Sequence, residues 1–169
     1  MPHLDAAYRF ARWLTRSPAD ADDIVQEALL RAYRGFDALR GSDVKAWLLT
    51  IVRNCHATAQ RQQQRRATLP LPEENDAPEG YAMVDQAPGP ERAAIQGDQE
   101  RTFARLMSAL SQEHREVLAL RELEELSYRE IAAVTSLPIG TVMSRLARAR
   151  GALRELWLRQ APGETHGVC

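Results

Sequence analysis

Apolar residues recur every three or four positions along most of residues 1–66, which is the spacing of one face of an α-helix. Ser17 is followed by Pro18, an arrangement typical of a helix N-cap and the first helical residue. Ser42 is placed to cap a further helix in the same way. This part of the chain is therefore predicted to form three or four helices. The apolar stripes are Leu4, Ala7, Tyr8, Ala11 and Leu14, then Ala21, Ile24, Val25, Ala28, Leu29, Ala32 and Phe36, then Val44, Trp47, Leu48, Ile51, Val52 and Cys55.

The same spacing predicts four more helices after residue 100. Their apolar stripes are Phe103, Leu106, Met107 and Leu110, then Val117, Leu118, Leu120 and Leu123, then Ile131, Ala132 and Val134, and last Ile139, Val142, Met143, Leu146, Leu153, Leu156 and Trp157. Residues 127–130, with the sequence SYRE, have the form of a capping box that opens the third of these helices. A tight turn at 136–138 precedes the last helix, and the whole chain is predicted to be all-α.

Residues 67–91 interrupt the helical pattern. This segment holds five of the nine prolines, six acidic residues and no lysine or arginine. Proline breaks helix interiors, and a run of like charges favours an extended chain. We therefore expect a flexible acidic linker at 67–91 that joins two small helical domains at 1–66 and 92–160, with a tail at 161–169.

The net charge of −1 conceals an uneven distribution along the 169 residues. Residues 1–66 carry 11 Lys and Arg against 7 Asp and Glu, and residues 92–169 carry 11 Arg against 10 acidic residues. Two mildly basic segments are compatible with nucleic acid binding. Cys55 and Cys169 do not suggest a disulfide framework and give no strong reason to expect a redox role. No stretch resembles a signal peptide or a membrane span, so a cytoplasmic protein is expected.

The segment from the capping box to the basic last helix has the layout of a helix-turn-helix. Small hydroxyl residues near the start of the last helix allow close approach to DNA, and arginines can bind phosphates or guanine edges. The alternative is an ordinary amphipathic helix with a solvated charged face. The capping box, the turn and the basic helix in succession favour DNA binding, and the residues expected to face the DNA are Thr141, Ser144, Arg145 and Arg148.

The predicted helix at 19–36 carries a leucine on its polar side. Leu30 lies opposite the core stripe, and its neighbours on that face are Asp23, Gln26, Glu27 and Arg34. An exposed leucine with a charged rim is typical of a protein-binding hot spot. A solvated face with one stray leucine explains the same residues equally well.

The predicted helix at 43–66 turns Lys45, Arg53, Asn54 and Arg61 outward. Arginine supplies phosphate contacts and asparagine can read a base edge, so this face is a candidate for nucleic acid binding. A solvated basic face remains the alternative. Trp47 is interpreted as a core residue rather than a base-stacking platform.

Signals of catalysis are poor. The four histidines are scattered, and the adjacent Cys55 and His56 point to different sides of a helix and make a poor metal pair. No P-loop, glycine-rich phosphate cradle or nucleophile elbow occurs. We therefore expect no enzyme activity, no metal site and no cofactor.

Three of these stretches together resemble the extracytoplasmic-function (ECF, group IV) sigma factors of bacterial RNA polymerase. The run DADDIVQEALLRAYRGF (20–36) is similar to region two, VKAWLLTIVRN (44–54) to the segment that melts and reads the −10 element, and residues 115–150 to region four. GTVMSRLARAR (140–150) is the most diagnostic stretch. The resemblance covers nearly the whole chain and implies promoter recognition, DNA melting and transcription initiation by core RNA polymerase, without catalysis by this chain.

The resemblance also implies roles for particular residues. The core polymerase would be bound by Asp23, Gln26, Glu27 and Leu30, the −10 element by Arg53, Asn54 and Arg61, and the −35 element by Thr141, Ser144, Arg145 and Arg148. One base of the −10 element is expected to be flipped out of the stack. An anti-sigma factor, often membrane-bound in this family, is the further partner expected.

Three positions depart from the family pattern. Met143 stands where Lys or Arg is usual, Val44 replaces a common Phe, and Thr58 replaces a common Asp. These changes are expected to alter promoter preference. A stand-alone helix-turn-helix regulator that binds DNA as a dimer is the alternative function, and residues 20–36 and the long acidic linker argue against it. An enzyme with a DNA-binding tail has no support in the sequence.

Overall fold

The computed structural model describes residues 3–15, 17–36, 43–67 and 101–160, and within these residues all regular structure is helical. The N-terminal bundle consists of α1 (Leu4–Leu14), α2 (Pro18–Gly35) and α3 (Val44–Ala67). The C-terminal bundle consists of a helix at 101–109, α5 (Gln112–Leu118), the π-helical segment η2 (Ala119–Leu123), α6 (Tyr128–Thr135) and α7 (Ile139–Gln160). The predicted all-α fold is confirmed. The predicted linker at 67–91, apart from Ala67, and the tail at 161–169 lie outside the described residues.

The N-terminal bundle forms because its three amphipathic helices share one apolar core. Phe10, Leu49 and Val52 have no exposed surface. The side chain of Ser17 accepts a hydrogen bond from the backbone N–H of Asp20, and Pro18 is the first helical residue, as predicted. At the start of α3 the backbone N–H of Ala46 donates to Oδ1 of Asp43 at 2.9 Å, so an aspartate supplies a cap. The predicted cap at position 42 lies outside the described residues.

The helix-turn-helix of the C-terminal bundle has the local chemistry that its sequence predicts. Ser127 and Glu130 form the capping box at the start of α6: each side chain accepts a hydrogen bond from the backbone N–H of the other. Ser136 ends α6 in the left-handed conformation with φ 55°. The carbonyl of Pro138 then accepts from the amides of Thr141 and Val142 and begins α7. Local bonds therefore end α6 and begin α7 on either side of the turn.

Some residues predicted to be in the apolar stripes are exposed instead. In α7 the buried residues include Val142, Leu146 and Ala149, whereas Ile139, Met143 and Trp157 are 44–53% exposed. Phe36, at the end of α2, is 58% exposed. The stripe predicted for α7 was therefore too wide, because a spacing of three or four also includes residues at the margin of the buried face.

One irregularity was not predicted. The apolar stripe from Val117 to Leu123 suggested one continuous α-helix, but the helix widens into η2 after Leu118. The N–H of Glu124 bonds the carbonyl of Ala119, five residues earlier, at 3.1 Å. Glu124, the residue directly after this wider turn, is only 2% exposed, so its carboxylate is buried.

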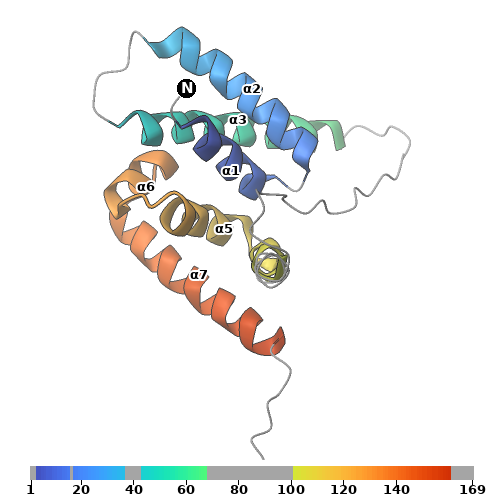
Figure 1. Cartoon of the computed structure of the whole chain (residues 1–169), viewed down its shortest axis with the longest axis vertical. Helices are drawn as coiled ribbons and strands as arrows, with labels where there is room; N and C mark the ends of the chain where they lie inside the picture. Colours follow the sequence, from blue (N-terminus) through green and yellow to red (C-terminus); the bar gives the residue numbers. More distant parts are fainter. Residues whose placement is uncertain (1–2, 16, 37–42, 68–100, 161–169) are drawn as a thin grey trace, which may run out of the picture.

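The two bundles pack directly against each other. α1 and α3 contact the C-terminal bundle through α5, η2 and α6, whereas α2 lies on the far side of α1 and α3 (Figure 1). Trp13 of α1 meets Phe103 edge-on, with ring centroids 5.9 Å apart. The apolar core is consequently continuous across both bundles. Within the described part of the chain, no helix is long and apolar enough to cross a membrane.

Candidate functional site

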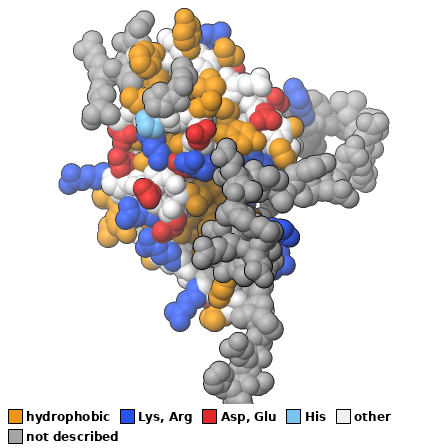
Figure 2. Space-filling view, in the orientation of Figure 1, with side chains coloured by type: hydrophobic (Ala, Val, Ile, Leu, Met, Phe, Trp, Pro, Cys, Tyr) orange, Lys and Arg blue, Asp and Glu red, His pale blue; other side chains and the backbone are white. Residues whose placement is uncertain are grey.

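The polar face of α2 is open to solvent, as predicted. Asp23, Gln26 and Glu27 are exposed, and Leu30 is 54% exposed among them. Glu27 is held by Arg31 through an ion pair of 2.7 Å between Nε and Oε1. Figure 2 shows hydrophobic side chains along α2 lying at the surface between charged ones.

The apolar part of this face is larger than the sequence indicated. Tyr33 is 79% exposed, and Phe36 is also exposed near the end of the helix. Tyr33 follows Leu30 by three positions, so it lies on the same side of α2. This spacing could have identified Tyr33 in the sequence as part of the exposed face, but a single tyrosine at a surface is too common to indicate a binding site. An exposed leucine with an exposed tyrosine beside it strengthens the interpretation of a protein-binding surface.

The predicted DNA-facing residues of α7 fall into two groups. Ser144 and Arg148 are exposed, and the Ser144 hydroxyl donates to the carbonyl of Thr141 at 3.0 Å. Thr141 is half-buried. The side chain of Arg145 is 21% exposed and pairs with Glu113 of α5 at 3.1 Å, so it lies at the flank of the exposed face rather than at its centre.

The outward face predicted for α3 is only partly outward. Asn54 and Arg61 are exposed. Arg53 instead meets Glu116 of the C-terminal bundle, with 2.6 Å between Nε and Oε1. The hydroxyl of Thr58 donates a hydrogen bond to the backbone carbonyl of Asn54, one turn earlier in α3, at 2.9 Å. The expectation that Arg53 points into solvent was wrong because the C-terminal bundle covers that side of α3.

The same correction applies to Lys45. Its ammonium group donates to the backbone carbonyl of Glu124 at 2.7 Å and lies 3.0 Å from the Oε2 atom of that residue. Arg9 of α1 adds two hydrogen bonds to the same carboxylate, at 3.0 and 3.2 Å. Glu124 therefore pairs with two cations of the N-terminal bundle from a position where water has almost no access.

Burial at the contact between the two bundles shifts the pKa values of two side chains, Glu116 and His56. Burial raises the pKa of Glu116 above its usual range, although Arg53 acts in the opposite direction. Burial, together with the positive charges of Arg115 and Arg53, lowers the pKa of His56. Next to it, the side-chain amides of Gln60 and Gln112 bond across the contact at 2.8 Å. These polar contacts lie beside the apolar contacts between the bundles, and water can replace their hydrogen bonds when the bundles separate.

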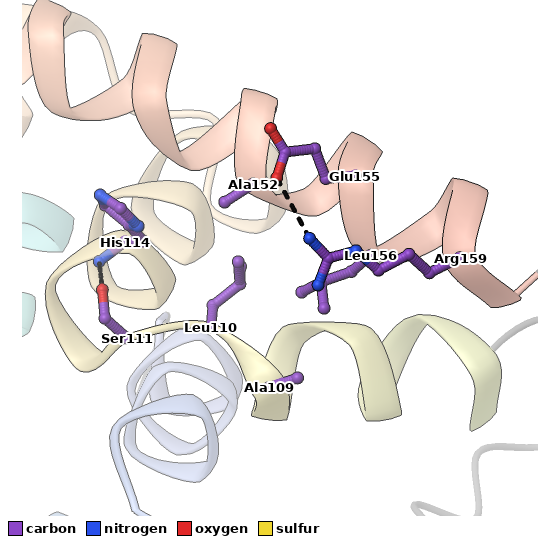
Figure 3. Close-up of a pocket in the computed structure, with 8 residues that line it drawn as sticks. All are labelled: Ala109, Leu110, Ser111, His114, Ala152, Glu155, Leu156 and Arg159. Carbon is purple, nitrogen blue, oxygen red and sulfur yellow. Dashed lines mark hydrogen bonds and ion pairs between the residues drawn. The ribbon is translucent and has the colours of Figure 1, made fainter.

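A shallow pocket lies between α7 and the turn before α5 (Figure 3). Its wall includes an ion pair between Glu155 and Arg159 at 3.9 Å, and the Ser111 side chain accepts from the amide of His114. The bond between Ser111 and His114 uses the backbone amide of His114 rather than its imidazole, and it caps the start of α5. The described residues also hold no group of three or more His, Cys, Asp or Glu able to bind a metal ion.

Comparison with known proteins agrees with this division into two bundles. Residues 1–66 match the family model for sigma-70 region 2, and residues 100–153 match the model for sigma-70 region 4. A region-2 bundle followed by a region-4 helix-turn-helix defines a sigma-70-type transcription initiation factor. The relatives narrow the class further.

The ECF RNA polymerase sigma-E factor of Escherichia coli K12 is 35% identical over 138 residues, which cover 79% of this chain and 72% of that protein. The RNA polymerase sigma-H factor of Pseudomonas aeruginosa is 36% identical over 140 residues, with 79% and 71% covered. The sigma factor RpoE of Bartonella quintana, solved with the anti-sigma factor NepR, matches with a TM-score of 0.67 and 30% identity over 94% of this chain and 93% of that one. The chain belongs to the ECF sigma factors of RNA polymerase.

As a sigma factor, the chain functions in promoter recognition by RNA polymerase. Sigma factors are transcription initiation factors that carry no catalytic activity of their own. The alternative of a stand-alone helix-turn-helix regulator is not favoured, because it does not explain why residues 1–66 match sigma-70 region 2.

Proposed function

We propose that this sigma factor binds core RNA polymerase through the exposed face of α2. Leu30, 54% exposed within an acidic and polar rim, is the observation that carries the assignment. Burying it against a partner removes apolar area from water, and the surrounding charges orient the contact. The contact residues are Asp23, Gln26, Glu27 and Leu30.

Promoter DNA is proposed to meet two separate surfaces. The surface for the −10 element lies on α3 and consists of Arg53, Asn54 and Arg61. The surface for the −35 element lies on α7 and consists of Thr141, Ser144, Arg145 and Arg148. The exposure of Asn54, Arg61, Ser144 and Arg148 supports direct contact. Arg53 and Arg145 must first leave Glu116 and Glu113, their present partners.

Engaging both DNA elements requires the two bundles to separate. The −10 and −35 elements are separated by about 25 base pairs, or roughly 85 Å of B-form DNA. Two bundles in direct contact do not reach that far. We propose domains at 1–66 and 92–160 joined by a linker at 67–91, and an extended chain of about 25 residues spans at most roughly 85 Å. The linker is therefore long enough for the separation.

Transcription with sigma-free core RNA polymerase on a genomic fragment library tests the proposal. We expect discrete transcript 5′ ends with shared upstream motifs near −10 and −35. The variant Glu27→Arg should lose the signal, because a reversed charge meets the polymerase and leaves Arg31 beside another arginine. Glu155→Arg is the matched control, since Glu155 is also an exposed helical glutamate with an arginine four residues later. Equal transcription by both variants would refute the α2 assignment.

An anti-sigma factor is the second protein partner that we propose. The Bartonella quintana relative was solved with its anti-sigma factor NepR, and that relative covers nearly the whole chain. Such a partner would cover the exposed α2 or DNA-binding surfaces and keep the protein inactive, in the cytoplasm where RNA polymerase acts. Affinity purification of this chain from native cells tests the idea. Recovery of free protein under every growth condition would refute it.

A further inference from the structure

The exposed side of α7 carries an apolar strip at its first turns. Met143 is 52% exposed and Ile139 is 44% exposed. They are four residues apart and so lie one above the other on the helix. Between them Gly140 has open space where a Cβ would project. The described part of the chain therefore leaves about half of Met143 uncovered, beside an exposed isoleucine.

The strip is separate from the core of the helix-turn-helix. Val142 and Leu146 are buried and hold α7 against α5 and α6. Met143 follows Val142 and lies at the edge of the buried face, next to the open side of the helix where the exposed Ser144 and Arg148 lie. Packing within the bundle therefore covers Val142 completely, whereas 52% of Met143 remains open to solvent.

The neighbouring groups narrow what could cover this strip. Ser144 offers a hydroxyl and Arg148 a guanidinium, which suit phosphates and base edges. Met143 itself cannot donate a hydrogen bond, so it cannot read guanine in the way that the Lys or Arg usual at this position can. The apolar group displayed on a base edge in the major groove is the C5-methyl of thymine.

We propose that Met143, supported by Ile139, contacts a thymine methyl group and so specifies thymine at one position of the −35 element. The inference rests on the proposed function, in which α7 enters the major groove. Residues at the N-terminal end of a recognition helix reach the base edges, and Ile139 and Met143 lie in the first two turns of α7. Methionine suits this contact because its unbranched thioether chain adapts to an irregular apolar surface.

Uracil substitution tests the contact on the unaltered protein. Uracil pairs as thymine does but lacks the C5-methyl group, so only the apolar contact changes. Each thymine of the −35 element, on both strands, is replaced in turn on a promoter that the holoenzyme transcribes. We expect one position at which uracil lowers transcription about fourfold at limiting holoenzyme, which is the effect of leaving about one methyl group unburied.

Two variants identify the residue. Met143→Ala should transcribe the thymine and uracil promoters equally at that position, whereas Ser144→Ala should keep the difference. Met143 is 52% exposed, so truncating it removes only part of a packed side chain and the variant should still fold, which a circular dichroism melt verifies. Met143→Arg should shift the preference at that position toward guanine.

The outcomes are distinct. Transcription that is insensitive to uracil at every position overturns the inference and leaves the proposed function intact. A uracil effect that persists in Met143→Ala also overturns it, because another residue then makes the contact. If core polymerase with this chain transcribes no promoter at all, the proposed function is overturned and this inference with it.

Discussion

Replacing Glu124 with glutamine removes one negative charge from the contact between the two bundles and leaves the side chain almost unchanged in size. The carboxylate belongs to the C-terminal bundle, whereas both of its cationic partners, Arg9 and Lys45, belong to the N-terminal bundle. The loss therefore weakens the association of the bundles more than the fold of either one. Glu124→Gln should shift the protein toward a form in which the bundles are separated.

The magnitude follows from the burial of the group. The Glu124 side chain is 1% exposed, and breaking a buried ion pair costs roughly 3–5 kcal/mol. The Arg9 side chain is 41% exposed, and solvent screening reduces its share of that cost. The Lys45 side chain, 25% exposed, is screened less. We expect Glu124→Gln to lose about 2–3 kcal/mol of interaction between the bundles.

Small-angle X-ray scattering measures the separation directly. Glu124→Gln should have a larger radius of gyration than the unaltered protein and a lower midpoint of thermal unfolding. The matched control is Glu125→Gln, the same substitution at the next residue, whose side chain is exposed. If the two variants have the same radius of gyration and the same midpoint, then Glu124 does not hold the bundles together and the reasoning is refuted.

Three further outcomes are expected. The lowered pKa of His56 means that the folded protein binds fewer protons there than the unfolded chain does, so stability is lost as the pH falls below the ordinary value of 6.5 through the lowered one. The raised pKa of Glu116 has the opposite effect, because the folded protein then gains stability as the pH falls. His56→Gln removes only the histidine contribution, so it should reduce the fall in melting temperature between about pH 7.5 and 5.5. An unchanged fall would contradict this. Ser127→Ala should lower the free energy of unfolding by about 1 kcal/mol in urea titrations, because it removes the cap of α6, and no change would show that the cap contributes nothing. Leu49→Ala should cost roughly 2–5 kcal/mol in the same titrations, since Leu49 has no exposed surface, and a cost below 1 kcal/mol would contradict its place in the core.

The places where the sequence predicted correctly share one physical property. Ser17 and Ser127 cap their helices through bonds to residues three positions away, and Leu30 is exposed because it lies opposite the buried stripe of its own helix. These features depend on the backbone geometry of a single helix. Phe36 and Met143 were placed in apolar stripes and are exposed, because periodicity alone does not decide how wide the buried face of a helix is.

By itself, the sequence determined the all-helical fold, the capped helix-turn-helix and the exposed polar face of α2, since local bonds and helical spacing decide all three. Only the tertiary structure decided that Arg53 and Lys45 face a second bundle rather than water. Arg53 meets a glutamate 63 residues away, and Arg9 meets one 115 residues away. Nothing in the spacing of apolar residues specifies which charged faces come together at such separations. Side-chain packing between the two bundles does so, because a buried carboxylate is stable only where the fold brings cations to it.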